Sequence, residues 1–181
     1  KKVIFFFFCW TWRGFAPDNE YSLKITDAAL SACADNDIKD IFITLWGDDG
    51  AECSKFAILP SLVFSAELAN GNRNIDKIKQ KFKDVVGCEF DDFMLFDKLD
   101  IATEKHDRGA SKYIFYNDLF MGIRDFKCSE SDRKYYKNLA DKFSLVKEKG
   151  EYTYLFDMYE KFARVLEIKC SLGIRTRKAY L

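Results

Sequence analysis

Two short apolar runs, VIFFFFCW at residues 3–10 and DIFITLW at residues 40–46, indicate the fold class most clearly. Each is rich in aromatic and β-branched residues and is followed by turn-forming residues, which is typical of strands buried on both faces of a parallel sheet. A helical pattern of apolar residues lies between them, with Ser22 as its predicted N-cap and Asn36 near its end. Strands that alternate with helices predict parallel pairing through crossover connections.

A second helix over residues 58–69 completes two strand-helix units, which leave an open sheet edge and one bare face. We therefore expect an α/β piece of a larger sheet or barrel whose other strands lie upstream of Lys1. The chain does not begin with Met, which favours a segment of a longer protein. Lys1 and Lys2 before the first apolar run imitate a signal peptide, but the run is too short to cross a bilayer and no small-residue cleavage site follows it.

The character of the sequence changes at about Gly71, beyond which charged residues interleave with Phe, Tyr and Leu at helical spacing. The sequence thus predicts an α/β region at residues 1–72 and an all-α region at residues 73–181, with a polar, mobile loop at residues 100–110. The aromatic residues of the later helices are expected to pack inward. The predicted helices span residues 75–86, 89–95, 111–123, 129–149 and 151–180, and the aromatic residues are Tyr113, Phe115, Tyr116, Phe120, Tyr152, Tyr154, Phe156, Tyr159 and Phe162.

The charge balance excludes several classes of partner. Lys plus Arg and Asp plus Glu number 29 each, so no net field attracts nucleic acid or an anionic membrane.

The six cysteines form no CxxC pair and the chain has no glycosylation sequon, which favours buried thiols in a cytoplasmic protein. His106 is the one histidine and has no second ligand at metal-binding spacing, so we expect neither a metal nor a cofactor.

All three tryptophans lie at the carboxyl ends of the two predicted strands. Trp10 and Trp12 come with Arg13 and then Asp18-Asn19 after the first strand, and Trp46 comes with Asp48 and Glu52 after the second. Ligands of parallel α/β folds bind at this end of the strands, where indole rings suit the C–H faces of sugars and carboxylates accept their hydroxyls. A Trp at a strand end can instead pack a barrel, and Asp-Asp-Gly can be a plain turn, but two matching loops favour a carbohydrate site.

The strings CWTWRGFAPDN and TLWGDDGAECSKFAILPSLVFSAELANG resemble the seventh and eighth strand-loop units of glycoside hydrolase family 20, in the subgroup with a helical C-terminal domain. YIFYNDLF and the last helix resemble that helical domain. The resemblance implies the last two βα units of a TIM (β/α)8 barrel followed by the helical domain. It also implies a β-N-acetylhexosaminidase, which removes terminal β-linked N-acetylglucosamine or N-acetylgalactosamine. The substrate's own acetamide acts as the nucleophile in this family, while an Asp-Glu pair orients it and protonates the leaving oxygen.

Carried over to this sequence, Trp46 would stack on the sugar or line the acetamide pocket, and Asp48 and Glu52 would accept hydrogen bonds from the sugar hydroxyls at positions 4 and 6. Trp12, with Trp10 beside it, would pack against the ring or the acetamide. The Asp-Glu pair would lie upstream of Lys1, so this segment alone would supply one wall of the pocket and no catalysis. Many relatives of other subgroups have a Glu where Asp48 stands, which leaves open which carboxylate makes the main contact. The Phe5–Phe8 run departs from the small residues expected at that strand.

The expected partners are a glycan ending in an amino sugar and the upstream part of the same barrel, and a homodimer is compatible with the sequence. Two other interpretations remain. The helical region could form a non-catalytic carbohydrate-binding or protein-interaction module, since no acid/base pair lies in the chain. A doubly wound α/β domain with an unrelated ligand is the other, although no glycine-rich phosphate loop follows the first strand.

Overall fold

The computed structural model describes residues 4–100 and 109–181. The chain divides into two compact units, one ending at Asp97 and one beginning at Lys98. The expected domain boundary at residues 72 and 73 stays a prediction, and the polar loop expected at residues 100–110 lies mostly outside the described residues.

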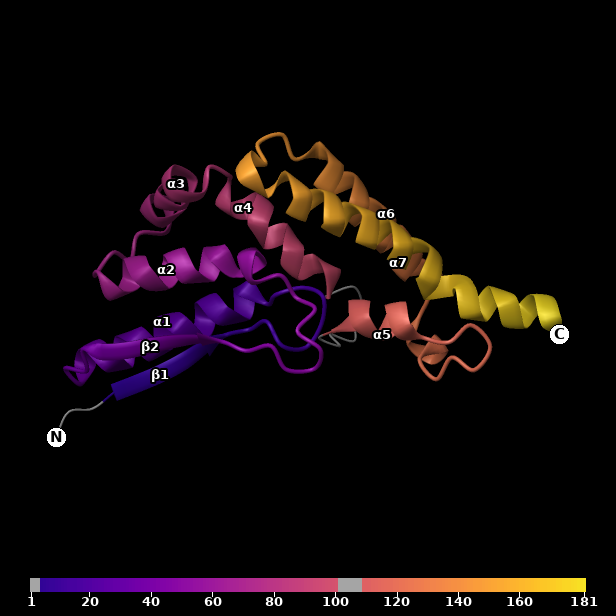
Figure 1. The fold of residues 1–181 in the computed structure, drawn as a ribbon, viewed down its shortest axis with the longest axis horizontal. Helices are drawn as coiled ribbons and strands as arrows, with labels where there is room; N and C mark the ends of the chain where they lie inside the picture. The colour runs from indigo at the N-terminus through magenta and orange to yellow at the C-terminus, as the bar shows by residue number, and fades with distance from the viewer. Residues whose placement is uncertain (1–3, 101–108) are drawn as a thin grey trace. The chain divides into compact units, whose positions relative to one another are not determined.

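The first unit is built on two parallel strands, β1 (Ile4–Cys9) and β2 (Asp40–Leu45). Their register pairs Ile4 with Asp40 and Cys9 with Leu45, so both strands end at the same edge of the sheet. Helix α1 (Asn19–Asp35) connects them and α2 (Leu59–Ala69) follows, so the predicted order of strands and helices is confirmed. Figure 1 shows the two strands side by side, with the helices of this unit on one side of them.

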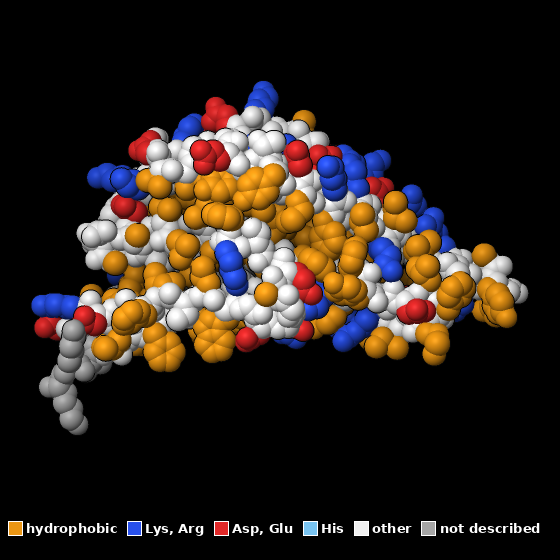
Figure 2. Space-filling model, in the orientation of Figure 1, with side chains coloured by type: hydrophobic (Ala, Val, Ile, Leu, Met, Phe, Trp, Pro, Cys, Tyr) orange, Lys and Arg blue, Asp and Glu red, His pale blue; other side chains and the backbone are white. Residues whose placement is uncertain are grey.

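Only one face of the two strands is covered. Phe7 and Cys9 are buried, and Phe7 forms a core cluster with Leu30 of α1 and Leu68 of α2. Phe6 on the opposite face is 66% exposed, and Phe42 of β2 is 61% exposed. The prediction of strands buried on both faces is therefore wrong for this chain, because its helices lie on one side of the sheet and side chains alternate along a strand. Hydrophobic side chains reach the surface in this region in Figure 2.

The same alternation accounts for the Phe5–Phe8 run. Phe5 and Phe7 share the covered face, where their ring centroids lie 6.3 Å apart. Phe8 on the other face is half-buried, because the ring of Trp12 packs edge-on against it at 4.9 Å. The Phe5–Phe8 run thus packs against the helices on one face of the sheet and against Trp12 on the other.

Helix α1 begins earlier than the sequence predicts. Asp18 is its N-cap, with the side chain accepting a hydrogen bond from the backbone N–H of Tyr21 over 2.9 Å. The predicted cap, Ser22, lies inside the helix, where its hydroxyl donates to the carbonyl of Asp18 and accepts from the N–H of Trp10. The end of α1 at Asp35, capped by Asn36, is as predicted.

The first unit continues as a series of short helices. Helix α3 spans Ile75–Val86, as predicted, and ends at Gly87 with φ 75°. Helix α4 (Phe90–Phe93) passes into the 3-10 helix η2 (Met94–Leu99), which replaces the single helix predicted at residues 89–95. A further 3-10 turn, η1 (Lys55–Ile58), precedes α2. Phe82, Phe93 and Phe96 are fully buried, and the ring of Phe93 packs edge to face against each of the other two, so aromatic packing holds these pieces together.

The second unit is a helical hairpin with a short helix beside it. Helices α6 (Glu130–Leu145) and α7 (Thr153–Tyr180) pack along each other, joined through η4 (Gly150–Tyr152), and α5 (Ala110–Tyr116) contacts α7. The fully buried side chains at the centre of this hairpin are Tyr136, Phe143, Leu155, Phe156, Tyr159 and Leu166.

The predicted helix over residues 111–123 stops at Tyr116, and a 3-10 turn η3 (Asp125–Lys127) follows the loop. The carboxylate of Asp118 accepts hydrogen bonds from the backbone N–H groups of Phe120 and Met121, both at 2.8 Å, which stabilises a turn in place of the helix. The expectation that the aromatic residues all pack inward is also wrong in part, because Tyr116, Phe120 and Tyr154 are 62%, 74% and 56% exposed.

Candidate functional site

The loops that follow β1 and β2 meet at the edge where both strands end. The hydroxyl of Thr11, a buried residue of the first loop, donates to the carbonyl oxygen of Trp46 in the second loop over 2.7 Å. The ammonium group of Lys55 donates to the same carbonyl at 2.7 Å and to the Thr11 hydroxyl at 3.3 Å. Two hydrogen bonds therefore join Thr11 to the segment after β2, and the third, between Lys55 and Trp46, lies within that segment.

The first loop carries two stacked indole rings. Trp10 and Trp12 have ring centroids 4.2 Å apart at an interplanar angle of 30°, and both are half-buried. Tyr21 of α1 packs edge-on against Trp10 at 5.4 Å. The rings are thus held by packing on both sides, which gives this loop a rigid aromatic surface.

The second loop presents a more open set of side chains. Trp46 is 48% exposed, and its indole N–H donates to the hydroxyl of Thr44 over 2.8 Å. Asp48 is exposed, whereas Glu52 is half-buried. Asp49, Gly50 and Ala51 are all left-handed, with φ values of 57°, 104° and 55°. Three consecutive residues of this kind are costly for the two that are not glycine, and they turn the chain back before Glu52.

The structure thus brings some of the predicted site residues together and not others. Trp10 and Trp12 touch each other, and Trp46 is joined to their loop through its backbone. Asp48 and Glu52 belong to the same tight turn but differ in exposure. We therefore describe this edge as a candidate sugar-binding wall with five side chains, which are Trp10, Trp12, Trp46, Asp48 and Glu52.

Two polar residues expected to face this edge are structural instead. Asp18 caps α1, and Asn19 is fully buried. The amide nitrogen of Asn19 donates to the carbonyl of Ala57 at 3.0 Å and to the carboxylate of Asp97 at 2.9 Å, while its oxygen accepts from the hydroxyl of Ser61 at 2.7 Å. This network ties the start of α1 to η1, α2 and η2 beneath the candidate wall.

Asp97 was not predicted as a site residue, because it lies two residues beyond the helix predicted at residues 89–95 and is distant in sequence from both loops. Its second carboxylate oxygen accepts from the backbone N–H of Glu20 at 2.8 Å, at the first turn of α1. Burial raises the pKa of Asp97 to about 7, against the opposing effect of these hydrogen bonds. The signal available in the sequence was the start of a helix, whose first N–H groups have no partner within the helix and favour a nearby acid.

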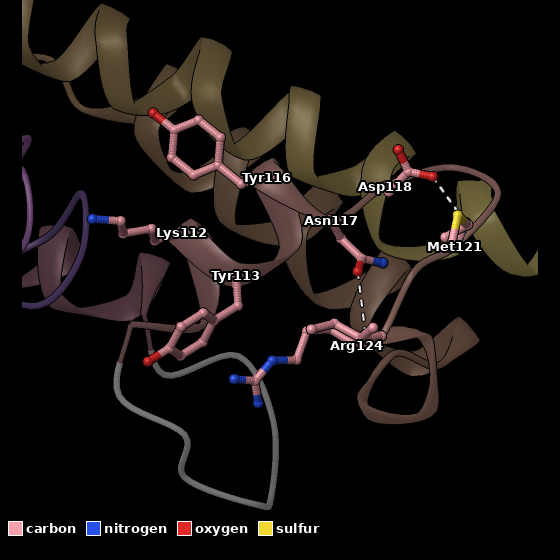
Figure 3. A pocket seen from close by; sticks show the side chains of 8 residues that line it. Lys112, Tyr113, Tyr116, Asn117, Asp118, Met121 and Arg124 are labelled. Carbon is pink, nitrogen blue, oxygen red and sulfur yellow. Dashed lines mark hydrogen bonds between the residues drawn. The ribbon is translucent and has the colours of Figure 1, made fainter.

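The second unit contains a pocket of its own. It has a volume of about 440 Å³ and lies where α5 passes into the loop at residues 117–124. The guanidinium of Arg124 lies 4.6 Å from the ring of Tyr113, and the Asn117 side-chain oxygen accepts the backbone N–H of Arg124 at 3.2 Å (Figure 3). The remaining lining residues are Lys112, Tyr116, Asp118, Met121 and Ile123.

Within residues 4–100 and 109–181, no group of three His, Cys, Asp or Glu side chains has an arrangement that could hold a metal ion. In the same part of the chain, none of the helices combines the length and the apolar character that crossing a bilayer requires. His106 falls outside the described residues.

A comparison with protein families places the helical region. The family model named Glycoside Hydrolase 20C C-terminal domain matches residues 91–181, which is half of the chain. This stretch contains η2 and all of the second unit. No curated protein matches the chain. The sequence resemblance and the family match agree, and the chain belongs to glycoside hydrolase family 20.

Proposed function

We propose that this chain supplies one wall of the sugar pocket in an exo-β-N-acetylhexosaminidase. The observation that carries the proposal is the hydrogen bond from Thr11 to the Trp46 carbonyl, which fastens together the two loops that hold all three tryptophans. Membership of family 20 supports a glycoside hydrolase. Aromatic faces and carboxylates on adjoining loops are the groups that hold a sugar ring and its hydroxyls.

We also propose that β1 and β2 are the seventh and eighth strands of a TIM barrel. A parallel strand pair with one covered face and exposed Phe6 and Phe42 on the other is what two adjacent strands would leave if the rest of the sheet were removed. The barrel interior would then cover the exposed side chains. Catalytic groups of such barrels gather at the carboxyl ends of the strands, where the candidate wall lies.

In the proposed mechanism, the upstream part of the barrel supplies the Asp-Glu pair and this chain supplies side chains that bind the sugar. The acetamide of the substrate attacks the anomeric carbon and forms an oxazoline, while an Asp-Glu pair of the upstream part orients the acetamide and protonates the leaving oxygen. Trp46 and Trp12 would hold the terminal sugar, and Asp48 and Glu52 would accept its hydroxyls. No cofactor enters this mechanism, and the chain alone would not turn over substrate.

The proposal extends to the surroundings of the enzyme. The partners would be a glycan ending in N-acetylglucosamine or N-acetylgalactosamine and the upstream part of the barrel, and a homodimer is compatible with this assembly. A cytoplasmic location agrees with cysteines that form no disulfide and are mostly buried in the described residues, such as Cys9, whose pKa is raised to about 12 by burial.

Kinetics of the intact protein on an aryl β-N-acetylglucosaminide test the proposal. Trp46→Ala and Glu52→Ala are expected to lower kcat/KM about ten- to a hundredfold, since each removes a contact of about 1.5–3 kcal/mol to the bound sugar. Phe56→Ala is the matched control, because Phe56 is a similarly exposed aromatic residue in η1. Unchanged kcat/KM in both site variants would remove the assignment.

The pocket of the second unit favours one alternative function, a carbohydrate-binding module. Tyr113 and Arg124 offer a ring face and a hydrogen-bond donor beside it. Equilibrium titration of the 181-residue chain with N-acetylglucosamine separates the two functions. We expect little binding, because the proposed catalytic pocket needs its upstream wall. Tight binding that Tyr113→Ala abolishes would support the alternative.

A further inference from the structure

Trp46 is held by hydrogen bonds at both its side chain and its backbone. The indole N–H donates to the hydroxyl of Thr44 at 2.8 Å, and that hydroxyl donates to the carbonyl of Phe7 on β1 at 3.2 Å. The backbone carbonyl of Trp46 accepts from Thr11 and Lys55, each at 2.7 Å. Two threonines therefore connect this residue to β1 and to the loop that follows it.

The role of the Thr44 hydroxyl follows from its single proton. A hydroxyl that gives its proton to the Phe7 carbonyl keeps lone pairs with which it accepts the indole N–H of Trp46. The indole N–H is therefore hydrogen-bonded within the protein, and the faces of the ring are the part of Trp46 that a ligand can contact. A ring that is 48% exposed and already fixed in orientation loses little conformational entropy when a ligand packs on it.

We propose that Thr44 and Thr11 are positioning residues that fix Trp46 as a stacking wall for the sugar. Neither threonine touches the substrate, and both act through Trp46. Thr44 fixes the orientation of the indole plane. Thr11 fixes the position of the Trp46 backbone relative to the strand ends. This inference rests on the proposed function, because it assumes that Trp46 packs on the bound sugar.

Thr11 and Lys55 contribute unequally to the backbone contact. Thr11 is 1% exposed, so its hydroxyl is shielded from competing water, whereas Lys55 is an exposed residue with a long side chain. A shielded hydrogen bond holds its geometry better than an exposed one. Lys55→Met should therefore have a smaller effect than Thr11→Val, and it separates the two donors.

Isosteric and conservative variants test the role of the hydroxyls. Thr44→Val removes the bonds to the indole and to Phe7 with little change of shape, and Thr44→Ser retains the hydroxyl. Stacking acts alike on the bound substrate and the transition state, so loss of the fixed ring should raise KM about three- to tenfold with kcat nearly unchanged. We expect this rise in the intact protein for Thr44→Val and Thr11→Val. Thr44→Ser and Thr11→Ser, which both retain a hydroxyl, should stay within about twofold of the wild-type KM, on the same reasoning.

A second measurement uses the 181-residue chain and no substrate. The three indole N–H signals are resolved by NMR and the Trp46 signal is assigned with Trp46→Phe. We expect the exchange of this proton with water to be faster in Thr44→Val and unchanged in Thr44→Ser. Thr11→Val leaves β2 intact and should keep the indole protected while it raises KM, so it tests the backbone contact independently.

The outcomes separate this inference from the proposed function. If Trp46→Ala itself leaves kcat/KM unchanged, the proposed function fails. If Trp46→Ala lowers kcat/KM while both valine variants keep the wild-type KM, the threonines do not position the ring and the inference is overturned. An equal rise of KM in the valine and serine variants would also overturn it, because the hydroxyl would not be the group responsible.

Discussion

The carboxylate of Glu52 lies against the α-carbon of Gly50. A Cβ added to Gly50 would stand 2.5 Å from both oxygens of that carboxylate, and Gly50 has φ 104°. The turn after Trp46 can therefore hold the Glu52 carboxylate in this position only if residue 50 has no side chain. Glycine at this position sets the direction of a carboxylate that the proposed pocket requires.

Gly50→Ala is therefore expected to displace Glu52 as well as strain the backbone. The strain should cost about 1–2 kcal/mol of unfolding free energy, and the displacement should lower kcat/KM of the intact protein about tenfold. Gly71→Ala is the matched control, since Gly71 has φ 83° and an added Cβ there meets nothing within 4 Å. Equal kinetics in the two variants would show that Gly50 does not act through Glu52.

Asp97 should make the stability of the first unit depend on pH. Burial raises its pKa from 3.8 to about 7, so the folded chain binds this proton more tightly than the unfolded chain does. The stabilising contribution is therefore complete below about pH 4 and is lost as the pH rises through about 7, on the order of 2–4 kcal/mol.

Urea unfolding of the wild type and of Asp97→Asn between pH 4 and pH 8 measures this contribution. The unfolding free energy of Asp97→Asn should not fall as the pH rises through about 7, because an amide does not ionise. Asp91→Asn should keep it, since the Asp91 side chain is 72% exposed. Parallel pH profiles for Asp97→Asn and the wild type would contradict the assignment to this carboxyl.

Gly173→Ala should destabilise the second unit although alanine is the better helix former. Gly173 lies inside α7, where a Cβ would stand 2.6 Å from a carboxylate oxygen of Asp125. The side chain of Asp125 is held by Asn117 at 2.7 Å and lies 3.5 Å from Arg177, so it cannot move freely.

We expect a loss of about 1–2 kcal/mol in Gly173→Ala, measured by chemical unfolding. In an Asp125→Ala background the same change should stabilise the protein by up to about 1 kcal/mol, because only helix propensity remains. The change in unfolding free energy caused by Gly173→Ala should therefore have opposite signs in the two backgrounds. The same sign in both would exclude a clash with Asp125.

The loop after α5 exposes large apolar side chains, with Phe120 at 74%, Met121 at 80% and Ile123 at 79%. Phe120→Ser and Ile123→Ser should change the unfolding free energy by no more than about 0.5 kcal/mol while lowering the binding of a hydrophobic dye. Phe143→Ala, which empties a fully buried position, should cost about 3–5 kcal/mol. A large loss in either serine variant would mean that the loop is packed in solution.

The sequence predicted the regular elements well and the side-chain environments less well. Periodicity was sufficient for β1, β2, α2 and α3, because their apolar spacing and their glycine and asparagine ends are local signals. The end of α5 and the true N-cap of α1 depend on which polar side chain takes the backbone N–H groups. Such competition among Asp18, Ser22 and Asp118 is decided by local geometry that periodicity does not contain.

The candidate site was predictable in outline only. The adjacency of the two loops follows from parallel strands that end at one edge, and the residue types suggested sugar chemistry. The anchoring of Trp46 by Thr44 and Thr11, and the buried contact of Asn19 with Asp97, join residues distant in sequence. Pairings of this kind require the folded chain.

The claim that the turn after β2 binds sugar hydroxyls is tested most directly by a thermodynamic cycle with the intact protein. The cycle combines Glu52→Ala with substrates lacking the 4- or 6-hydroxyl, and it compares kcat/KM for all four combinations of each pair. We predict that deoxygenation at one of these positions costs the wild type about tenfold or more and costs Glu52→Ala almost nothing. Strictly additive losses at both positions would contradict a contact between Glu52 and the sugar.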